Sequence, residues 1–214
     1  AIANFMRYER PQRGREREFW QLNADLFGVD SPMADAEIIE MSYRSVLNFG
    51  ARPDMFTVRV NNRQLVNQLL GQFLGLDVIG ANMMTKLLDK KNKIPPETFK
   101  QQAIEIFGAE GSREGLPKLA QMISMKSVDD LPAELSDSPS VQQIRTVMDL
   151  LRQKGVSNAV FDVTLMRGLD YYTGTVFEFF DNAPENNRAM FGGGRYDGLV
   201  GLFGVEPMAT VGVG

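Results

Sequence analysis

The feature that most constrains the fold is the order in which two hydrophobic periodicities follow one another along the chain. Residues 1–61 contain strand-like stretches such as EFWQLNADLFG, where apolar and polar residues alternate, and MFTVRVN. Residues 62–157 instead place apolar residues at helical spacing, with Gly and Pro between the segments. Strand-like stretches return in residues 158–214, in NAVFDVTLM, TGTVFEFF and ATVGVG. This order predicts an α+β fold, in which a helical insertion interrupts a mainly antiparallel sheet.

Composition limits the chemistry that such a fold can carry. The 214 residues include 43% hydrophobic and 23% charged residues, as in ordinary globular proteins. No apolar run approaches the ~20 residues that a membrane-spanning helix needs, so we expect a cytoplasmic protein with no membrane contact. The chain has no Cys and no His, which excludes disulfides and Ser–His or Cys–His catalysis. We therefore expect no protein metal site, and chemistry that depends on Arg, Lys, carboxylates, Tyr or a bound ion.

An arginine-rich loop lies between the first two predicted strands. RYERPQRGRER, residues 7–17, contains five arginines and two glutamates, although the net charge of the chain is −4. Guanidinium groups match phosphate oxygens and keep their charge, so a focused nucleotide clamp fits better than a broad nucleic-acid track. From composition alone, a solvated loop with weak ion pairs explains the pattern equally well.

The strand EFWQLNADLFG places polar residues on one face. Its alternation predicts that the apolar residues pack on the core: Trp20, Leu22, Ala24 and Leu26. Gln21 and Asp25 then share the opposite face, ~13 Å apart. Because Asp is a poor strand former, Asp25 indicates a polar cavity in which a carboxylate accepts from an ammonium or N–H donor. A simply hydrated face remains an open alternative.

The segment after this strand predicts a helix with recognisable ends. Ser31 and Pro32 are typical of an N-cap followed by Pro at the first helical position, and Gly50 is typical of a helix end. The helical spacing predicts these buried residues: Ile38, Met41, Val46 and Phe49.

Two further stretches combine charge, aromatic rings and glycine. RGLDYY, residues 167–172, brings a fixed cation and two phenols to a strand junction, as a substrate pocket requires. An Arg167–Asp170 pair across a turn, with half-buried tyrosines, explains it as well. GGGRYDG, residues 192–198, allows a close backbone approach to a ligand or a tight turn, and matches neither a Walker loop nor a dinucleotide fingerprint.

Taken together and in this order, RYERPQRGREREFWQ, RGLDYYTGTVFE and GGGRYDGL resemble the catalytic domain of the histidyl-tRNA synthetase family. The first segment resembles motif 2 of class II aminoacyl-tRNA synthetases, and the others resemble two segments peculiar to histidine-specific members. The resemblance covers residues 5–61 and 160–214, together with VNNRQLV, and places an insertion at residues 62–157. It implies that histidine reacts with ATP, in the presence of Mg²⁺, to give histidyl-adenylate, which is transferred to tRNA.

The resemblance also implies roles for individual residues. Arg7 and Arg167 would be catalytic: Arg7 would hold the α-phosphate, and Arg167 would bridge it to the substrate carboxylate. Glu9 would lie near the adenine, and Arg15 near ATP and the tRNA end. The histidine site would comprise six residues: Gln21 at the ammonium, Asp25 at the imidazole, Tyr171, Tyr172 and Tyr196 around the ring, and Gly193 giving the backbone room.

The implied partners are histidine, ATP and the acceptor end of tRNA, with a homodimer expected of the longer enzyme. Because the chain begins at motif 2 and ends before the motif 3 arginine, we expect a piece of a longer enzyme, inactive alone. A silent paralogue is the alternative, such as the regulatory subunit of ATP phosphoribosyltransferase or the sensor domain of a kinase. The ATP-binding residues favour the synthetase, and RGLDYYTG disfavours a scaffold of another class II specificity.

Overall fold

A six-stranded sheet forms the centre of the computed structural model, which describes residues 1–8, 10–11, 16–91, 93–166, 171–186 and 189–214. Its strand order is β3-β8-β7-β6-β4-β5, and every pairing is antiparallel except β4 with β5. The bounds are β3 (Ala24–Phe27), β4 (Phe56–Asn62), β5 (Ala159–Phe161), β6 (Thr175–Asp181), β7 (Ala189–Arg195) and β8 (Thr210–Val213). The prediction of a mainly antiparallel α+β fold is confirmed.

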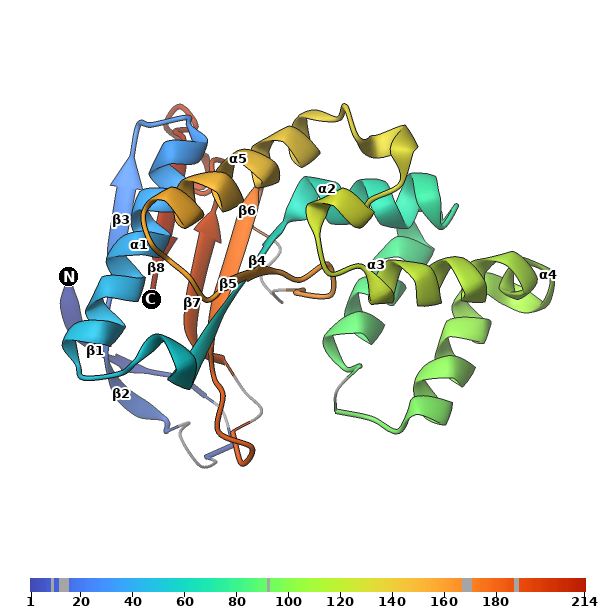
Figure 1. Cartoon of the computed structure of the whole chain (residues 1–214), viewed down its shortest axis with the longest axis horizontal. Helices are drawn as coiled ribbons and strands as arrows, with labels where there is room; N and C mark the ends of the chain where they lie inside the picture. Colours follow the sequence, from blue (N-terminus) through green and yellow to red (C-terminus); the bar gives the residue numbers. More distant parts are fainter. Residues whose placement is uncertain (9, 12–15, 92, 167–170, 187–188) are drawn as a thin grey trace.

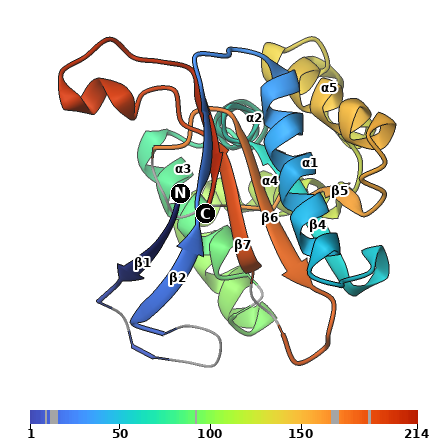
Figure 2. The same ribbon diagram turned by 90° about the vertical axis from the view of Figure 1, so that its left-hand side faces the viewer.

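Strands β1 (Ile2–Met6) and β2 (Glu18–Leu22) form a separate antiparallel ribbon, which projects from the sheet in Figure 2. The strand predicted over EFWQLNADLFG is therefore broken at Asn23 into β2 and β3. Ala24 and Leu26 contact the core as expected. The prediction was wrong for Trp20 and Leu22, which are 73% and 50% exposed. They belong to β2, which pairs with β1 and lies beyond the part of the sheet that the helices cover.

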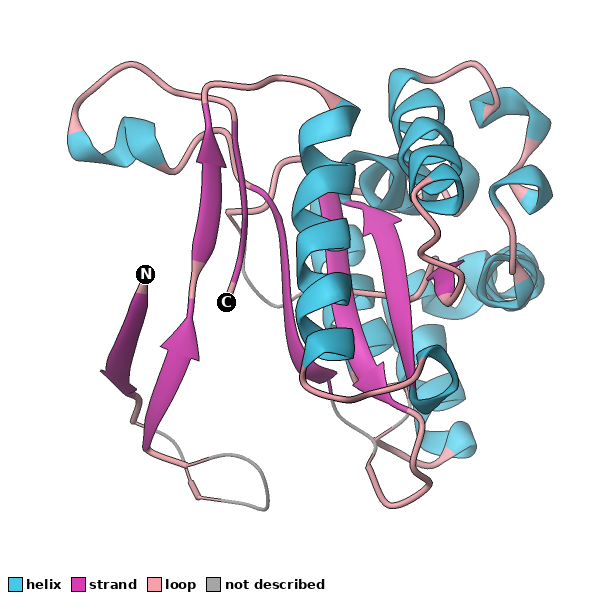
Figure 3. Ribbon diagram, turned by 60° about the vertical axis from the view of Figure 1, so that its left-hand side comes forward, coloured by secondary structure: helices cyan, strands magenta, loops and turns pink. Residues whose placement is uncertain are grey.

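Helix α1 (Pro32–Asn48) covers one face of the sheet, with α5 (Pro139–Gln153) beside it (Figures 1 and 3). The predicted start is confirmed, because the Ser31 hydroxyl accepts a hydrogen bond from the Met33 N–H at 3.2 Å and Pro32 opens the helix. Ile38 is buried as predicted. Phe49 is 91% exposed instead, because the helix ends at Asn48 and the cap lies beyond the buried stripe.

The predicted helical block contains α2 (Arg63–Gln68), α3 (Val78–Asp89), α4 (Pro96–Ser124) and α5. Gly108 interrupts α4 with a φ of +73°, so α4 is two helices joined at a kink. Single helical turns complete the described chain: Pro53–Met55, Leu69–Phe73, Val128–Asp130, Ala133–Leu135 and Val200–Phe203. No helix among the described residues has the length and apolarity needed to cross a membrane.

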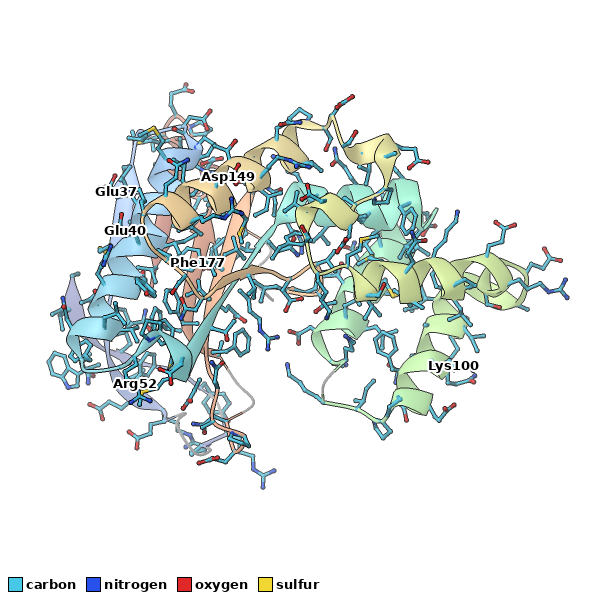
Figure 4. All side chains as sticks on the ribbon, in the orientation of Figure 1. Glu37, Glu40, Arg52, Lys100, Asp149 and Phe177 are labelled. Carbon is cyan, nitrogen blue, oxygen red and sulfur yellow. The ribbon has the colours of Figure 1, made fainter. Side chains whose placement is uncertain are left out.

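One buried apolar cluster runs from the sheet into the helical block. It includes Val58 and Phe177 from the sheet, Ile39 from α1, Met84 from α3 and Met122 from α4, all 0% exposed. Figure 4 shows Glu37 and Glu40 on α1 and Asp149 on α5, the helices that cover this sheet face. The opposite face of the sheet carries the polar side chains considered next.

Candidate functional site

The centre of the site is a hydrogen bond from the Tyr196 hydroxyl to the carboxylate of Asp25. Asp25 lies on β3, directly opposite Gly212 on β8, and Gly212 lies opposite Gly194 on β7. Tyr196 follows β7 and keeps its backbone bonded to β8, since its N–H donates to the Thr210 carbonyl at 2.8 Å. The sheet order therefore brings together two residues far apart in sequence, with β8 between them.

Three predicted tyrosines form one aromatic cluster beside this carboxylate. The ring centroids of Tyr171 and Tyr172 lie 4.8 Å apart, and that of Tyr196 lies 5.8 Å from Tyr171 and 6.3 Å from Tyr172. Tyr172 and Tyr196 are buried, whereas Tyr171 is 37% exposed. Their apolar support is Leu165 and Val176, which belong to the same buried cluster. The arrangement places an aromatic cluster next to the Asp25 carboxylate, which is itself exposed to solvent.

Electrostatics determine that Tyr196 is the donor in its hydrogen bond with Asp25. Burial raises the pKa of the Tyr196 phenol above its ordinary value, and the hydrogen bond with Asp25 raises it further. The phenol is therefore a protonated donor at neutral pH, and it occupies Oδ1 of Asp25. A carboxylate has a second oxygen with free acceptor capacity, so Asp25 can also accept from an N–H of a small ligand.

Glycines on β7 and β8 make room for these side chains. A Cβ placed on Gly212 would collide with the Asp25 carboxylate and the Tyr196 hydroxyl. A Cβ on Gly194 would lie 2.7 Å from Cδ1 of Tyr172, whereas one on Gly193 would meet the Phe177 ring at 2.6 Å. Gly194 and Gly212 thus face the tyrosines, and Gly193 faces the core. Sequence analysis noted the glycines of GGGRYDG without giving Gly194 a role of its own, and it missed Gly212, although the alternate glycines of VGVG are a detectable signal.

Gln21 extends the polar face toward the ribbon. Its side-chain Nε2 donates to Oδ1 of Asn23 at 2.5 Å. A Cβ on Gly214 would lie 2.6 Å from that Nε2, so the end of β8 passes next to Gln21. Gln21, Asn23 and Asp25 consequently lie on the side of β8 to which Gly212 and Gly214 are turned.

Arg7 follows β1 and lies over an aromatic ring. Its guanidinium carbon is 3.7 Å from the centroid of the Phe19 ring, and its backbone N–H donates to the Arg17 carbonyl at 2.8 Å. Phe19 and Gln21 share one face of β2, so Arg7 lies on the Gln21 side of the ribbon. The Nε of Arg7 is buried and makes no hydrogen bond within the part of the chain that the structure describes.

Three predicted site residues, Glu9, Arg15 and Arg167, lie outside the described residues. The described part of the chain contains no cluster of three or more carboxylates that could hold a metal ion. Sequence reasoning also missed a buried ion pair between Arg195 and Asp35, whose carboxylate is 0% exposed.

Two cavities lie away from the tyrosine cluster. A cavity of about 290 Å³ lies between α3 and α4, and is lined by residues such as Lys86 and Glu105. Another, of about 390 Å³, is bordered by Gln64, Gln143 and Arg195. Neither is lined by Asp25 or by the three tyrosines.

Comparison with known proteins agrees with this geometry. Residues 2–213 match the protein-family model for histidyl-tRNA synthetase. The chain is 35% identical over 215 residues to the histidine–tRNA ligase of Leptospira biflexa, covering 100% of this chain and 49% of that protein. It is 37% identical over 221 residues to the histidine–tRNA ligase of Pyrococcus furiosus, covering 99% and 49%. The chain thus spans about half the length of the curated relatives that it matches.

Solved structures share the fold. A Bacillus halodurans protein described as an ATP phosphoribosyltransferase regulatory subunit/histidyl-tRNA synthetase has a TM-score of 0.79 at 23% identity, covering 99% of this chain and 54% of that one. The histidyl-tRNA synthetase of Nostoc sp. PCC 7120 has a TM-score of 0.77 at 24% identity, covering 92% and 48%.

Proposed function

Because the chain belongs to the histidyl-tRNA synthetase family, we propose that it forms part of the catalytic domain of an enzyme that activates histidine with ATP. The observation that carries the proposal is the Asp25 carboxylate, which accepts a hydrogen bond from Tyr196, whose ring in turn packs against Tyr171 and Tyr172. An imidazole offers an N–H donor on a flat aromatic ring. The carboxylate matches the donor and the phenol rings match the flat surface.

Activation joins two anions, and this determines what the protein has to supply. A carboxylate oxygen of histidine attacks the α-phosphorus of ATP, and pyrophosphate leaves with the electrons of the broken P–O bond. The carboxylate is already ionised at neutral pH, so no general base is required and a chain without His suffices. Positioning and positive charge at the α-phosphate provide the catalysis.

We assign the α-phosphate to Arg7, and Gln21 to the substrate ammonium. Stacking on Phe19 holds the Arg7 guanidinium in place, and a guanidinium keeps the positive charge that anion binding needs. Arg167 is proposed as the second catalytic cation, with Glu9 and Arg15 at ATP. Mg²⁺ would enter with ATP and neutralise phosphate charge.

For the longer protein, we propose the acceptor end of tRNA as the second substrate, a homodimer and a cytoplasmic location. We also propose that residues 62–157 form an insertion between the two halves of the catalytic core. These proposals rest on family membership.

A histidine-binding regulatory subunit is the second candidate function. It is favoured by the similarity to the Bacillus halodurans protein whose description includes an ATP phosphoribosyltransferase regulatory subunit. Both candidates would bind histidine, but only the synthetase would form an adenylate. Arg7 and the relatives named histidine–tRNA ligase favour the synthetase.

The deciding experiment is histidine-dependent ATP–pyrophosphate exchange by the protein expressed from its complete gene. We expect exchange with histidine and none with other amino acids. Arg7→Met should lower kcat/KM by a factor of about 100, as removal of one transition-state donor does. Histidine binding in calorimetry without exchange would instead identify the regulatory subunit, and a protein that does not bind histidine would contradict the assigned site.

A further inference from the structure

A fully buried arginine lies behind the tyrosine cluster, on the face of the sheet that α1 covers. Arg195 is 2% exposed, and all three nitrogens of its guanidinium donate hydrogen bonds. Nε and Nη2 reach Oδ1 of Asp35 at 2.9 and 2.6 Å, and Nη1 reaches Oδ1 of Asp197 at 3.1 Å. Nη2 also donates to the carbonyls of Ser31, at 3.1 Å, and Val29, at 3.3 Å.

This guanidinium connects three parts of the fold. Asp35 lies in the first turn of α1, and its other oxygen accepts from the Thr175 hydroxyl on β6 at 2.6 Å. Ser31 and Val29 belong to the connection between β3 and α1. Burial alone would lower the pKa of Arg195, but the carboxylates of Asp35 and Asp197 outweigh it and raise the pKa. The arginine therefore stays charged and ties β7 to α1 and β6.

Tyr196 lies between two residues of this hydrogen-bond network. Arg195 and Asp197 flank it in sequence, and alternation along the strand directs its side chain to the opposite face, where it meets Asp25. Its backbone N–H donates to the Thr210 carbonyl at 2.8 Å, and the Thr210 N–H donates to Oδ1 of Asp197 at 3.0 Å. The residues on both sides of Tyr196 are thus fixed by hydrogen bonds on the opposite face of the sheet, which restricts the direction of its side chain.

The same network reaches the second tyrosine. The Thr173 N–H donates to the Arg195 carbonyl at 2.8 Å, and the Thr173 hydroxyl lies 3.1 Å from Oδ2 of Asp197. Thr173 directly follows Tyr172 in sequence. The segment that carries Tyr172 is therefore hydrogen-bonded to Arg195 and Asp197, the two neighbours of Tyr196.

We propose that Arg195 is a positioning residue for the substrate side-chain site: its fork, fixed by Asp35, sets the direction of Tyr196 and thereby the acceptor geometry of Asp25. A lysine would keep the charge but not the planar fork that reaches two carboxylates and two carbonyls at once. The proposed function supplies only the identity of the ligand, and the placement of Tyr196 does not depend on it.

The kinetic test uses the protein from its complete gene, with Arg195→Lys and the milder, isosteric Thr175→Val. The KM for histidine in ATP–pyrophosphate exchange should rise by about tenfold or more in Arg195→Lys, and less in Thr175→Val. The KM for ATP should stay within about twofold of the wild-type value in both. Val147→Ala, a truncation of a buried residue on α5, is the control for general destabilisation, and should not raise the KM for histidine selectively.

The second readout requires neither histidine nor ATP. NMR of ring-labelled tyrosine follows the ionisation of Tyr196, assigned with Tyr196→Phe. The described titratable groups that face this phenol are Asp25, Tyr171 and Tyr172, and in the wild type its pKa lies above the ordinary 10.0. In Arg195→Lys, a phenol released from Asp25 should ionise at lower pH, nearer to that ordinary value.

The outcomes of these experiments distinguish the positioning role of Arg195 from the proposed activation of histidine. A Tyr196 signal that moves in folded Arg195→Lys supports the positioning role even if the protein does not activate histidine. An unmoved signal in variants whose circular dichroism matches the wild type would overturn it, as would equal increases in the KM for histidine and for ATP. If Arg195→Lys does not fold, Thr175→Val decides by the same criteria.

Discussion

At the scale of single residues, Gly212 is a restrictive position because it lies beside the central contact of the site. A side chain there would occupy the space in which the Tyr196 hydroxyl meets the Asp25 carboxylate. Gly212→Ala should therefore raise the KM for histidine by about tenfold or more and reduce stability by about 1–3 kcal/mol, the usual cost of overpacking. Pyrophosphate exchange and urea unfolding measure the two effects.

A matched control is available two residues beyond Tyr196. Gly198 has no atom within 4 Å of an added Cβ and does not have a positive φ, so Gly198→Ala should change neither quantity appreciably. Wild-type histidine affinity in Gly212→Ala would show that Asp25 and Tyr196 do not need to meet for binding.

The sequence reveals the members of the site more readily than the contacts between them. RGLDYY pointed to Tyr171 and Tyr172, because unusual residue types gather in a short stretch, whereas Tyr196 entered through the family resemblance of GGGRYDGL. The pair Arg195–Asp35 joins positions 160 residues apart. Asp35 in particular has the pattern of an ordinary acidic first helical turn, so nothing local marks it as a buried partner.

At the scale of elements, the contact between α1 and α5 gives a pH-dependent prediction. The Lys154 ammonium donates to Glu40 Oε2 at 2.8 Å, and this bond lowers the pKa of Glu40 below its ordinary 4.5. A lowered folded pKa means that the pair stabilises the fold above pH 4.5 and that this contribution is lost as the pH falls below it. Glu40→Gln should cost about 0.5–1 kcal/mol at neutral pH, and nothing at about pH 3.

Urea unfolding at the two pH values measures this difference. Glu37→Gln is the control, because Glu37 lies on the same helix and is exposed to solvent (Figure 4). Its effect should stay within about 0.5 kcal/mol at either pH. A loss of stability in Glu40→Gln that is equally large at both pH values would assign it to packing instead of charge.

Element ends were predictable where local chemistry sets them. Ser31 and Pro32 marked the start of α1, since capping depends on neighbouring residues only. The break at Asn23 was not predictable, because the alternation continues through it and only strand pairing changes there. Trp20 has the pattern of a core residue and is exposed, since its face of β2 lies beyond the helices.

At the scale of the whole molecule, the sheet and the helical block share one core. The order of periodicities indicated where the block begins and ends, but it could not indicate how the block packs. Helix α5 lies within residues 62–157 and still contacts α1 through Lys154 and Glu40. The division into a core and an insertion therefore remains a prediction about the order of segments along the chain. Whether the helical block unfolds independently of the sheet is a separate question.

The shared core leads to a prediction about cooperativity. Met84 on α3 is 0% exposed and belongs to the same buried cluster as Val58 and Phe177 of the sheet. Met84→Ala should lower the free energy of unfolding by about 2–5 kcal/mol. Native-state hydrogen exchange should then show the amides of β6 and of α4 losing protection by the same free energy, because they open in one cooperative unit.

Met83→Ala is the matched control, since Met83 is adjacent on α3 and 49% exposed. It should change the unfolding free energy by less than about 0.5 kcal/mol. Amides of β6 that keep their protection in Met84→Ala, while those of α3 and α4 lose it, would mean that the helical block opens on its own. The block would then be able to move against the sheet without disturbing the Asp25–Tyr196 contact. A single shared loss of protection would instead couple the packing of α3 to the geometry of the Asp25–Tyr196 contact.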